Sequence, residues 1–246
     1  RLLGNSPKIE LDARCNLGRT ALMFACFHGH KDTVQLFLDQ SNKSIEFNAQ
    51  DDSGTTALMF ACQKGHKDAV KLLTNYSNVD LNIPDEEGHT PFMVACQNGH
   101  EDVAQLFISS SDLNARDKKG STAFMFACYH GLKNLVQLCL SKNIELNVQN
   151  NDGHTAMMRA CQNGHKVVVQ LLLDSPEIQL NIRDKDGNTA FSLACSHGHK
   201  DVVQLLLDCP EIELNTRDND GNTAFDLACF RGQIDVVELL WDLDDL

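Results

Sequence analysis

The chain has 246 residues, of which 42% are hydrophobic, and a formal net charge of −13 at pH 7. This length and composition suffice for a folded core, while no apolar run reaches the length of a membrane span and no signal-peptide pattern opens the chain. The negative charge argues against a nucleic-acid backbone as a partner and favours a basic protein or peptide.

Residues 1–14 align with the end of a repeated unit whose beginning is absent. The segment LLGNSP at 2–7 corresponds to LLLDSP at 171–176. Because the first segment begins partway through a helical pattern, we expect the sequence to be part of a longer protein. Residues 1–14 would then be the remnant of a truncated upstream repeat.

After residue 14, a pattern of glycine, one variable residue, threonine and alanine or proline recurs seven times. The steps between successive copies range from 32 to 36 residues, and a second glycine follows the first after eleven residues in every copy. Two glycines kept in phase through seven copies indicate an internal repeat. The repeats start near residues 15, 51, 85, 117, 150, 184 and 218.

Each repeat predicts a turn followed by two short helices. In the copy that begins at Asp184, DKDG is a turn pattern, Thr189 suits a helix N-cap, and Gly198 suits the end of the first helix. Asp201 suits the positive end of a second, apolar helix. A helix pair of this size cannot bury its apolar face alone, so we expect the pairs to stack on their neighbours.

The pattern D-x-x-G-x-T-P-L-H-x-A-A, followed by Gly-His and a Leu-Leu helix, is the signature of the ankyrin repeat, and this sequence resembles it from about residue 5 to 243. HTPFMVA at 89–95 and five Gly-His pairs carry the resemblance. It implies an all-α ankyrin-repeat solenoid of seven helix–turn–helix repeats with projecting hairpin or turn loops, forming one domain over residues 1–246. It also implies protein recognition rather than catalysis, in a concave groove made of the turn tips and first helices.

One family residue is replaced throughout. The histidine that follows Thr-Pro-Leu in the family braces the hairpins by hydrogen bonds, whereas five repeats here have methionine and the last two have serine and aspartate. We therefore expect the polar bracing to be lost or replaced by packing, with ordinary stability as the result. The replacing residues are Met23, Met59, Met93, Met125, Met158, Ser192 and Asp226.

Seven of the ten cysteines occupy one repeat position, each after an alanine within an apolar run. Cysteine in such a place acts as a small buried hydrophobe, which favours a reducing compartment and therefore an intracellular, cytoplasmic protein. Cys15 and Cys209 lie elsewhere and are the cysteines that we expect to be reactive. The recurrent ones are Cys26, Cys62, Cys96, Cys128, Cys161, Cys195 and Cys229.

The histidines and cysteines also raise the question of a metal site. Cys-x-x-x-His occurs in five repeats, but zinc needs four ligands at one point, and these pairs recur once per repeat along the stack. His28 and His197 form chelate-like pairs with His30 and His199, which are structural histidines in the family. No phosphate loop or nucleophile elbow is present. We therefore expect no metal, no cofactor and no enzymatic activity.

The predicted partner-binding residues flank the turn glycine or precede the second glycine, with Arg159 added from a first helix. These positions vary between repeats while the structural ones stay fixed, which is typical of a recognition surface on a scaffold. Neutral drift on a solvated face would give the same pattern. The predicted residues are Phe27, His28, Asp52, Lys64, Glu86, Glu87, His89, Lys118, Lys119, Tyr129, His130, His154, Arg159, His197, Phe230 and Arg231.

Three aromatic residues, Phe27, Tyr129 and Phe230, stand where other repeats have glutamine or serine. They are either binding hot spots or residues that pack on a neighbouring repeat. Arg159 stands where other repeats have Phe, Val or Leu. Either its stem lies along apolar surface with the charged head in solvent, which we favour, or it reaches a ligand or a carboxylate.

The second and third turns carry an acidic group: Asp51, Asp52, Asp85, Glu86 and Glu87. It is either a solvated face or a site that prefers lysine or arginine of a partner, through an attraction that salt weakens.

We interpret the chain as a non-catalytic scaffold that binds a protein or peptide, with no nucleic acid, no direct membrane insertion and a monomeric state. One alternative is a structural or spring-like spacer within a larger channel or membrane-associated protein. Another is an accessory targeting domain of a multidomain enzyme. Charge reversal at Glu86 and Glu87 together with Tyr129→Ala separates a binder, which loses affinity, from a spacer, which loses nothing.

Overall fold

The computed structural model describes residues 10–39 and 45–241, so most of the predicted upstream remnant at 1–14 lies outside the described residues. Within them the protein has seven pairs of α-helices, and one isolated antiparallel bridge, between Gln50 and Thr56, is its only β-type pairing. The all-α prediction is confirmed. The first helices are α1 (Ala21–Phe27), α3 (Ala57–Lys64), α5 (Pro91–Gln97), α7 (Ala123–Tyr129), α9 (Ala156–Gln162), α11 (Ala190–Ser196) and α13 (Ala224–Phe230).

The second helices complete the pairs. In the third repeat the second helix is α-helical for four residues only and continues as a 3-10 turn, η1 (Gln105–Phe107). The second helices are α2 (Lys31–Asp39), α4 (Lys67–Thr74), α6 (Glu101–Ala104), α8 (Lys133–Leu140), α10 (Lys166–Leu173), α12 (Lys200–Leu207) and α14 (Ile234–Trp241).

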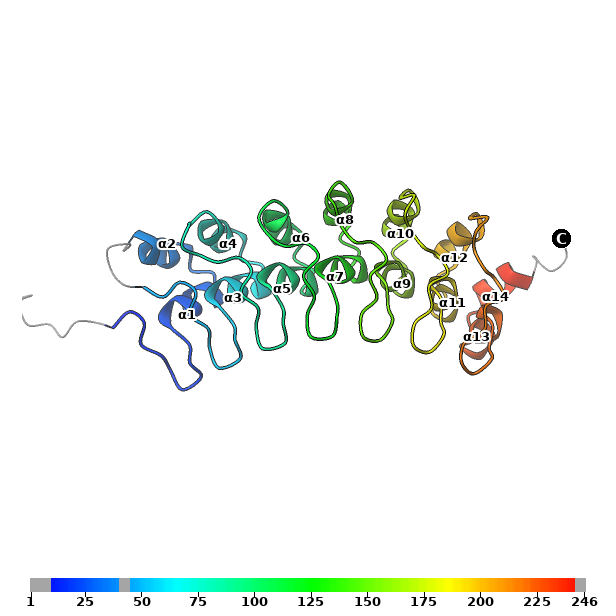
Figure 1. The fold of residues 1–246 in the computed structure, drawn as a ribbon, viewed down its shortest axis with the longest axis horizontal. Helices are drawn as coiled ribbons and strands as arrows, with labels where there is room; N and C mark the ends of the chain where they lie inside the picture. Colours follow the sequence, from blue (N-terminus) through cyan, green and yellow to red (C-terminus); the bar gives the residue numbers. More distant parts are fainter. Residues whose placement is uncertain (1–9, 40–44, 242–246) are drawn as a thin grey trace, which may run out of the picture. The chain divides into compact units, whose positions relative to one another are not determined.

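The chain divides into two compact units, Arg1–Ser111 with α1–α6 (unit 1) and Asp112–Leu246 with α7–α14 (unit 2). Within each unit, every first helix contacts the next first helix, and every second helix contacts the next second helix. Figure 1 shows the two rows of helices in each unit, with the turns projecting beyond the row of first helices. Each unit is therefore a stack of helix pairs in which contacts run between neighbours.

Threonine begins every first helix, as predicted from the sequence. The Thr20 hydroxyl accepts a hydrogen bond from the Met23 N–H, and the Thr20 N–H in turn donates to the Met23 sulfur at 3.4 Å. This reciprocal arrangement is a capping box in which a thioether, a weak acceptor, takes the usual place of a carboxylate.

The capping box also corrects a prediction. The expected loss of polar bracing at the methionine position is wrong for the helix starts, because Met59 and Met158 make the same bond as Met23. In the last two repeats Ser192 and Asp226 make it with oxygen, at 2.9 Å in both. The backbone and side-chain hydrogen bonds from Thr223 also lower the pKa of Asp226.

The second glycine of each repeat ends the first helix. After α1 the Gly29 N–H bonds to the Cys26 carbonyl and the His30 N–H to the Ala25 carbonyl, the two bonds of a Schellman motif. A second reason for glycine comes from the next repeat. A Cβ at Gly164, where φ is +70°, would lie 2.4–2.8 Å from the ring of His199. Both the backbone conformation and the neighbouring ring therefore require glycine.

The first glycine closes the turn between repeats. At Gly54 φ is +75°, and a Cβ there would meet the backbone of Asp85 and Glu86 at 2.7–3.1 Å. Each turn is also held by its leading Asp or Asn: Asp51 Oδ1 accepts from the N–H groups of Ser53 and Thr55. The two phased glycines of the sequence thus mark the two places where consecutive repeats approach most closely.

The core of each unit is built from alanine, cysteine, methionine and phenylalanine of the first helices and from valine and leucine of the second. Six of the seven recurrent cysteines are buried, as predicted. Cys229 is exposed, so the prediction is wrong for that copy. The reason is local, since in the described residues no helix packs on the outer side of α13, which also leaves Phe230 84% exposed.

Candidate recognition face

A histidine at the start of the second helix connects consecutive repeats. His66 Nε2 lies 3.1 Å from the Phe27 carbonyl, and His165 Nε2 lies 2.8 Å from the Tyr129 carbonyl. A carbonyl oxygen can only accept, so Nε2 carries the proton in each ring. In the last repeat Gln233 takes this role and donates to the Ser196 carbonyl at 3.2 Å. These bonds fix the residues just before the second glycine, which belong to the predicted binding positions.

An asparagine that follows α2, α6, α8 and α10 forms another connection between repeats. Asn147 Nδ2 donates to the Glu177 carbonyl at 2.7 Å, while its Oδ1 accepts from the Gln179 N–H at 2.9 Å. Asn48, Asn114 and Asn181 repeat this pair of bonds with the following repeat. These asparagines are therefore used by the framework.

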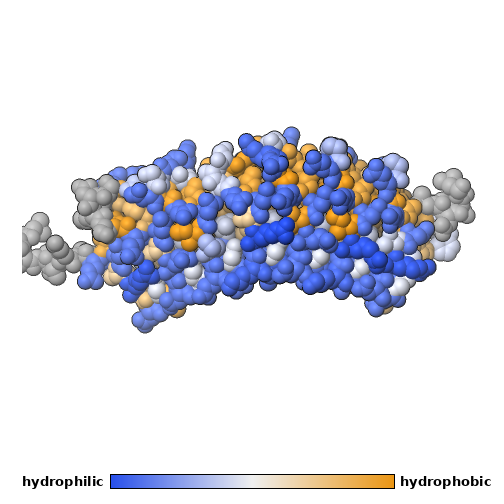
Figure 2. Space-filling view, viewed as in Figure 1, coloured by the Kyte–Doolittle hydropathy of each residue, from blue (hydrophilic) through white to orange (hydrophobic). Residues whose placement is uncertain are grey.

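The turns are joined to one another through the backbone. Three backbone N–H groups, of Asp52, Glu86 and Lys185, donate to backbone carbonyl groups of the preceding turn at 3.0–3.1 Å. The acceptors are the carbonyl groups of Leu17, Ser53 and Asp152. These bonds hold the backbones of neighbouring tips together and leave the side chains of Asp52, Glu86 and Lys185 exposed. Figure 2 shows that hydrophilic side chains cover the turns of both units. We call the tips and the ends of the first helices the recognition face of each unit.

The predicted binding residues lie on this face in two degrees of exposure. Four are half-buried: Phe27, His89, His154 and Arg159. The others are exposed: His28, Asp52, Lys64, Glu86, Glu87, Lys118, Lys119, Tyr129, His130, His197, Phe230 and Arg231.

In unit 1 the centre of the face is a stack of rings and cations. The Phe27 ring packs edge-on against Phe60 at 5.8 Å between centroids. Lys64 Nζ lies 4.6 Å from the centre of the Phe27 ring, and the Arg19 guanidinium lies 4.8 Å from that of Phe60. Of the two interpretations of Phe27, packing on the next repeat is therefore confirmed. Cations over aromatic faces stabilise this layer while remaining accessible to a partner.

The acidic group of the second and third turns is smaller than the sequence indicates. Asp51 is buried and its Oδ2 pairs with Arg19 Nε at 3.1 Å. Asp85 accepts two backbone N–H groups of its own turn and lies 3.3 Å from His89 Nδ1. Because these two carboxylates hold the framework, Asp52, Glu86 and Glu87 are the carboxylates left facing solvent in this group.

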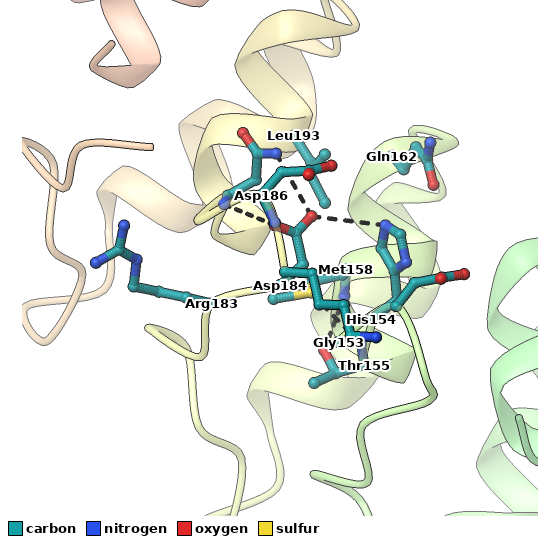
Figure 3. Close-up of polar contacts among 12 residues, drawn as sticks. Gly153, His154, Thr155, Met158, Gln162, Arg183, Asp184, Asp186 and Leu193 are labelled. Carbon is teal, nitrogen blue, oxygen red and sulfur yellow. Dashed lines mark hydrogen bonds and ion pairs between the residues drawn. The ribbon is translucent and has the colours of Figure 1, made fainter. Parts of the chain in front are cut away.

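In unit 2 the equivalent contact has different chemistry. His154 occupies the position of Arg19, and its Nε2 lies 3.6 Å from Oδ2 of Asp184, which occupies the position of Asp51. Asp184 is buried, and its Oδ1 accepts from the N–H groups of Asp186 and Asn188. Figure 3 shows the His154 ring directed at this carboxylate. His154 Nδ1 is buried and has no hydrogen-bond partner.

Arg159 lies beside His154. The sequence left two alternatives for its charged head, exposure to solvent or contact with a ligand or carboxylate, and the structure matches neither of them alone. Arg159 is half-buried, and its guanidinium donates to Gln162 Oε1 at 3.2 Å. Burial lowers the pKa of Arg159, while the charges of Asp152, Tyr129 and Asp184 oppose that effect. The head group is therefore held by Gln162 within the electrostatic influence of these carboxylates, rather than free in solvent.

Burial also lowers the pKa of His154 below its ordinary value of 6.5, and the charge of Arg159 lowers it further. The carboxylates of Asp184, Asp152 and Asp186 act in the opposite direction. Since the net shift is downward, His154 is uncharged at neutral pH, and Arg159 is the cation of this cluster.

The pairing between turns is the feature that sequence reasoning missed. The residue after one turn glycine contacts the leading residue of the next turn, as in Arg19 with Asp51 and His154 with Asp184. In the fourth repeat Ser121 Oγ accepts from Asn150 Nδ2 at 3.2 Å. The matching polarity of these positions, which lie 29 to 32 residues apart, is visible in the sequence and could have indicated the contact.

The cysteines and histidines do not converge. In the described part of the chain, no group of three or more His, Cys, Asp or Glu side chains could hold a metal ion. Cys15 is exposed, as a reactive thiol requires. Cys209 is half-buried, and burial together with the nearby Asp208 and Glu211 raises the pKa of its thiol, which disfavours the predicted reactivity. The exposed Cys229 takes its place as a candidate.

Comparison with known families agrees with this architecture. The family model for ankyrin repeats, which describes three copies, matches residues 1–85, 41–117, 92–184 and 177–245. The chain therefore belongs to the ankyrin-repeat family, whose members generally serve as protein-interaction modules and are typically non-catalytic. No curated protein matches the chain. Across the described helices, none is long and apolar enough to cross a membrane.

Proposed function

We propose that the chain is a non-catalytic scaffold that binds a protein or peptide through its recognition face. The observation that supports this proposal is that, within each repeat, one set of residues makes the contacts between repeats and a different set varies. Glycine, histidine, asparagine and the leading turn residue are used in contacts between repeats, whereas the residues beside them vary and most of the predicted binding residues among them are exposed. A rigid backbone with variable exposed side chains lowers the entropy lost when a partner binds.

The exposed carboxylates of unit 1 indicate the chemistry of a partner. Asp52, Glu86 and Glu87 stand on two consecutive tips whose backbones are hydrogen-bonded to each other. They favour a basic segment, through an attraction that weakens as salt screens it. Tyr129 of unit 2, with its side chain 42% exposed, is the aromatic anchor that we propose for the same partner or another. We also propose that all seven repeats form one domain and act as a monomer.

The test is capture of a partner by the immobilised chain, followed by its affinity for two matched variants. The face variant is Glu86→Lys, Glu87→Lys and Tyr129→Ala. The control variant, with the same change in net charge, is Asp32→Lys, Glu238→Lys and Gln137→Ala, at exposed positions of second helices. We expect the face variant to weaken binding at least about tenfold, roughly 1.4 kcal/mol, and the control to leave it unchanged. Equal affinity of the two variants would favour a spacer.

A further inference from the structure

The contact between His154 and Asp184 is one of three versions of the same arrangement. In unit 1 a permanent cation meets a carboxylate, Arg19 Nε to Asp51 Oδ2 at 3.1 Å. In unit 2, between the fourth and fifth repeats of the chain, two neutral groups meet, Ser121 and Asn150. Both versions are matched in charge and within hydrogen-bond distance. A neutral His154 can at most donate its Nε2–H to Asp184, so the charges of this pair are balanced only when the ring is protonated.

The geometry around His154 is that of an unfinished contact. The distance of 3.6 Å from Nε2 to Asp184 Oδ2 is too long for a hydrogen bond, although the two atoms face each other. The other ring nitrogen is buried without a partner. The side chains of His154 and Asp184 are 18% and 3% exposed, so solvent does little to satisfy the ring. Asp184 already accepts hydrogen bonds from the backbone of its own turn and, at 3.5 Å, from Asn188 Nδ2 on the oxygen that faces the ring. A small movement of the ring would complete the pair.

Arg159 supplies the competing charge. Its guanidinium is attracted by the carboxylates of Asp152 and Asp184, the same groups that attract a protonated His154. The charge of Asp186 also acts on the ring in the same direction as those of Asp184 and Asp152. Two adjacent cations repel each other in a half-buried site, where charges are poorly screened. A hydrogen bond to Gln162 is what holds the flexible Arg159 head in place, and an arginine stem can leave such a position by rotation.

We propose that His154 and Arg159 form a proton-operated exchange on the recognition face of unit 2: on taking up a proton, His154 closes onto Asp184 Oδ2 and the Arg159 guanidinium turns out to solvent. One proton enters from water, and the charge of the face rises by one. This proposal goes beyond partner binding, because it concerns the free chain and holds whatever the partner is.

The test is an NMR titration of the labelled full chain between about pH 5 and 8, following the His154 ring and the Arg159 Cδ–Hδ resonances. We expect both to move with one midpoint. His154→Gln should abolish the movement of Arg159. The matched control His89→Gln, at the same position of the third repeat, should leave it unchanged. An Arg159 resonance that ignores the titration of His154 would overturn the proposal.

Two further variants test the direction of the coupling. Arg159→Leu, the residue type found at this place in the last two repeats, removes the competing cation and should raise the His154 midpoint. Asp184→Asn removes the attracting carboxylate and should lower it. The turn should survive this change, because Asn150 holds the equivalent turn with the same two backbone bonds. If Arg159→Leu leaves the midpoint unchanged, Arg159 is not the competitor and the exchange is excluded.

Discussion

In the first and fifth repeats, the residue after the turn glycine contacts the leading residue of the turn in the next repeat. In unit 1 the contact is made by Arg19 on the buried Asp51, with Phe60 beneath the guanidinium. In unit 2 it is made by His154 on the buried Asp184, with Arg159 close by. The backbone is held alike in the two places, because each carboxylate accepts two N–H groups of its own turn. The difference lies in side-chain chemistry alone.

This comparison shows which features of a repeat are free to change. Replacing arginine with histidine leaves the turn intact but converts a permanent charge into one that depends on pH. Burial lowers the pKa of this histidine, and Arg159, which stands in place of an apolar residue, lowers it further, so the ring is uncharged near neutral pH. The framework therefore tolerates chemical variation at these positions, which belong to the face that we propose for partner binding.

The largest effect should come from breaking the framework shared by the two units. Gly164→Ala places a side chain at positive φ and against the His199 ring, whose bond to the Gln162 carbonyl is then lost. We expect a cost of about 1–2 kcal/mol for the backbone and about 1 kcal/mol for the hydrogen bond. Gly232→Ala is the matched control, because φ there is +67° and no atom lies within 4 Å. Equal losses in urea unfolding would contradict the role given to His199.

Removing the fixed charge of unit 1 should have the next largest effect. Arg19→Met leaves the buried Asp51 carboxylate without its cation, and we expect a loss of about 1–2 kcal/mol, limited because the arginine side chain is 32% exposed. Hydrogen exchange in residues 51–60 measures it. Adding Asp51→Asn, which keeps the acceptor for the turn, should recover part of the loss. If the double variant is less stable than Arg19→Met, the charge pair is not the cause.

When Arg19 is replaced by histidine, the stability contributed by the contact with Asp51 should depend on pH in the opposite direction to that contributed by His154 and Asp184. The pKa of His154 is lowered in the folded chain, so the unfolded chain binds more protons below pH 6.5, and stability falls as pH falls through that value. His154→Arg should remove this loss. Arg19→His should instead add stability at low pH, because the buried Asp51 carboxylate beside it raises the pKa of the new histidine, while the nearby Arg14 is paired with Glu46. Urea unfolding at pH 5.5 and 7.5 measures both, and the same sign for the two histidines would refute this interpretation.

The smallest effect on the protein should come from thiol labelling, whose rate should differ between cysteines that occupy the same position in different repeats. Burial raises the pKa of Cys26 to about 12, so this thiol in unit 1 stays protonated and protected. Its equivalent in unit 2, Cys229, is exposed. We expect Cys15 and Cys229 to react first with a thiol reagent, identified by mass spectrometry, and Cys26 to react only after unfolding. Early labelling of Cys26 would show that α1 is not packed as described.

The repeat architecture could be read from the sequence because its signals are local. Each N-cap threonine and each helix-ending glycine acts within a few residues, and seven copies reinforce one another. Contacts over a whole repeat were harder to predict. Nothing local reveals that Asp51 turns inward to Arg19 while Asp52 faces solvent, or that the Met23 sulfur accepts a hydrogen bond. The exposure of Cys229 depends on what packs on α13, which its own sequence does not encode.

The central claim is that the framework holds the tips and first-helix ends so that their variable side chains can bind a partner. Hydrogen exchange of the full chain, with and without a captured partner, tests it most directly. The account predicts slower exchange at the turns 51–55, 85–89, 117–121 or 150–154 and at the ends of the adjoining first helices, with α4, α8 and α10 unchanged. Protection confined to the second helices would contradict it.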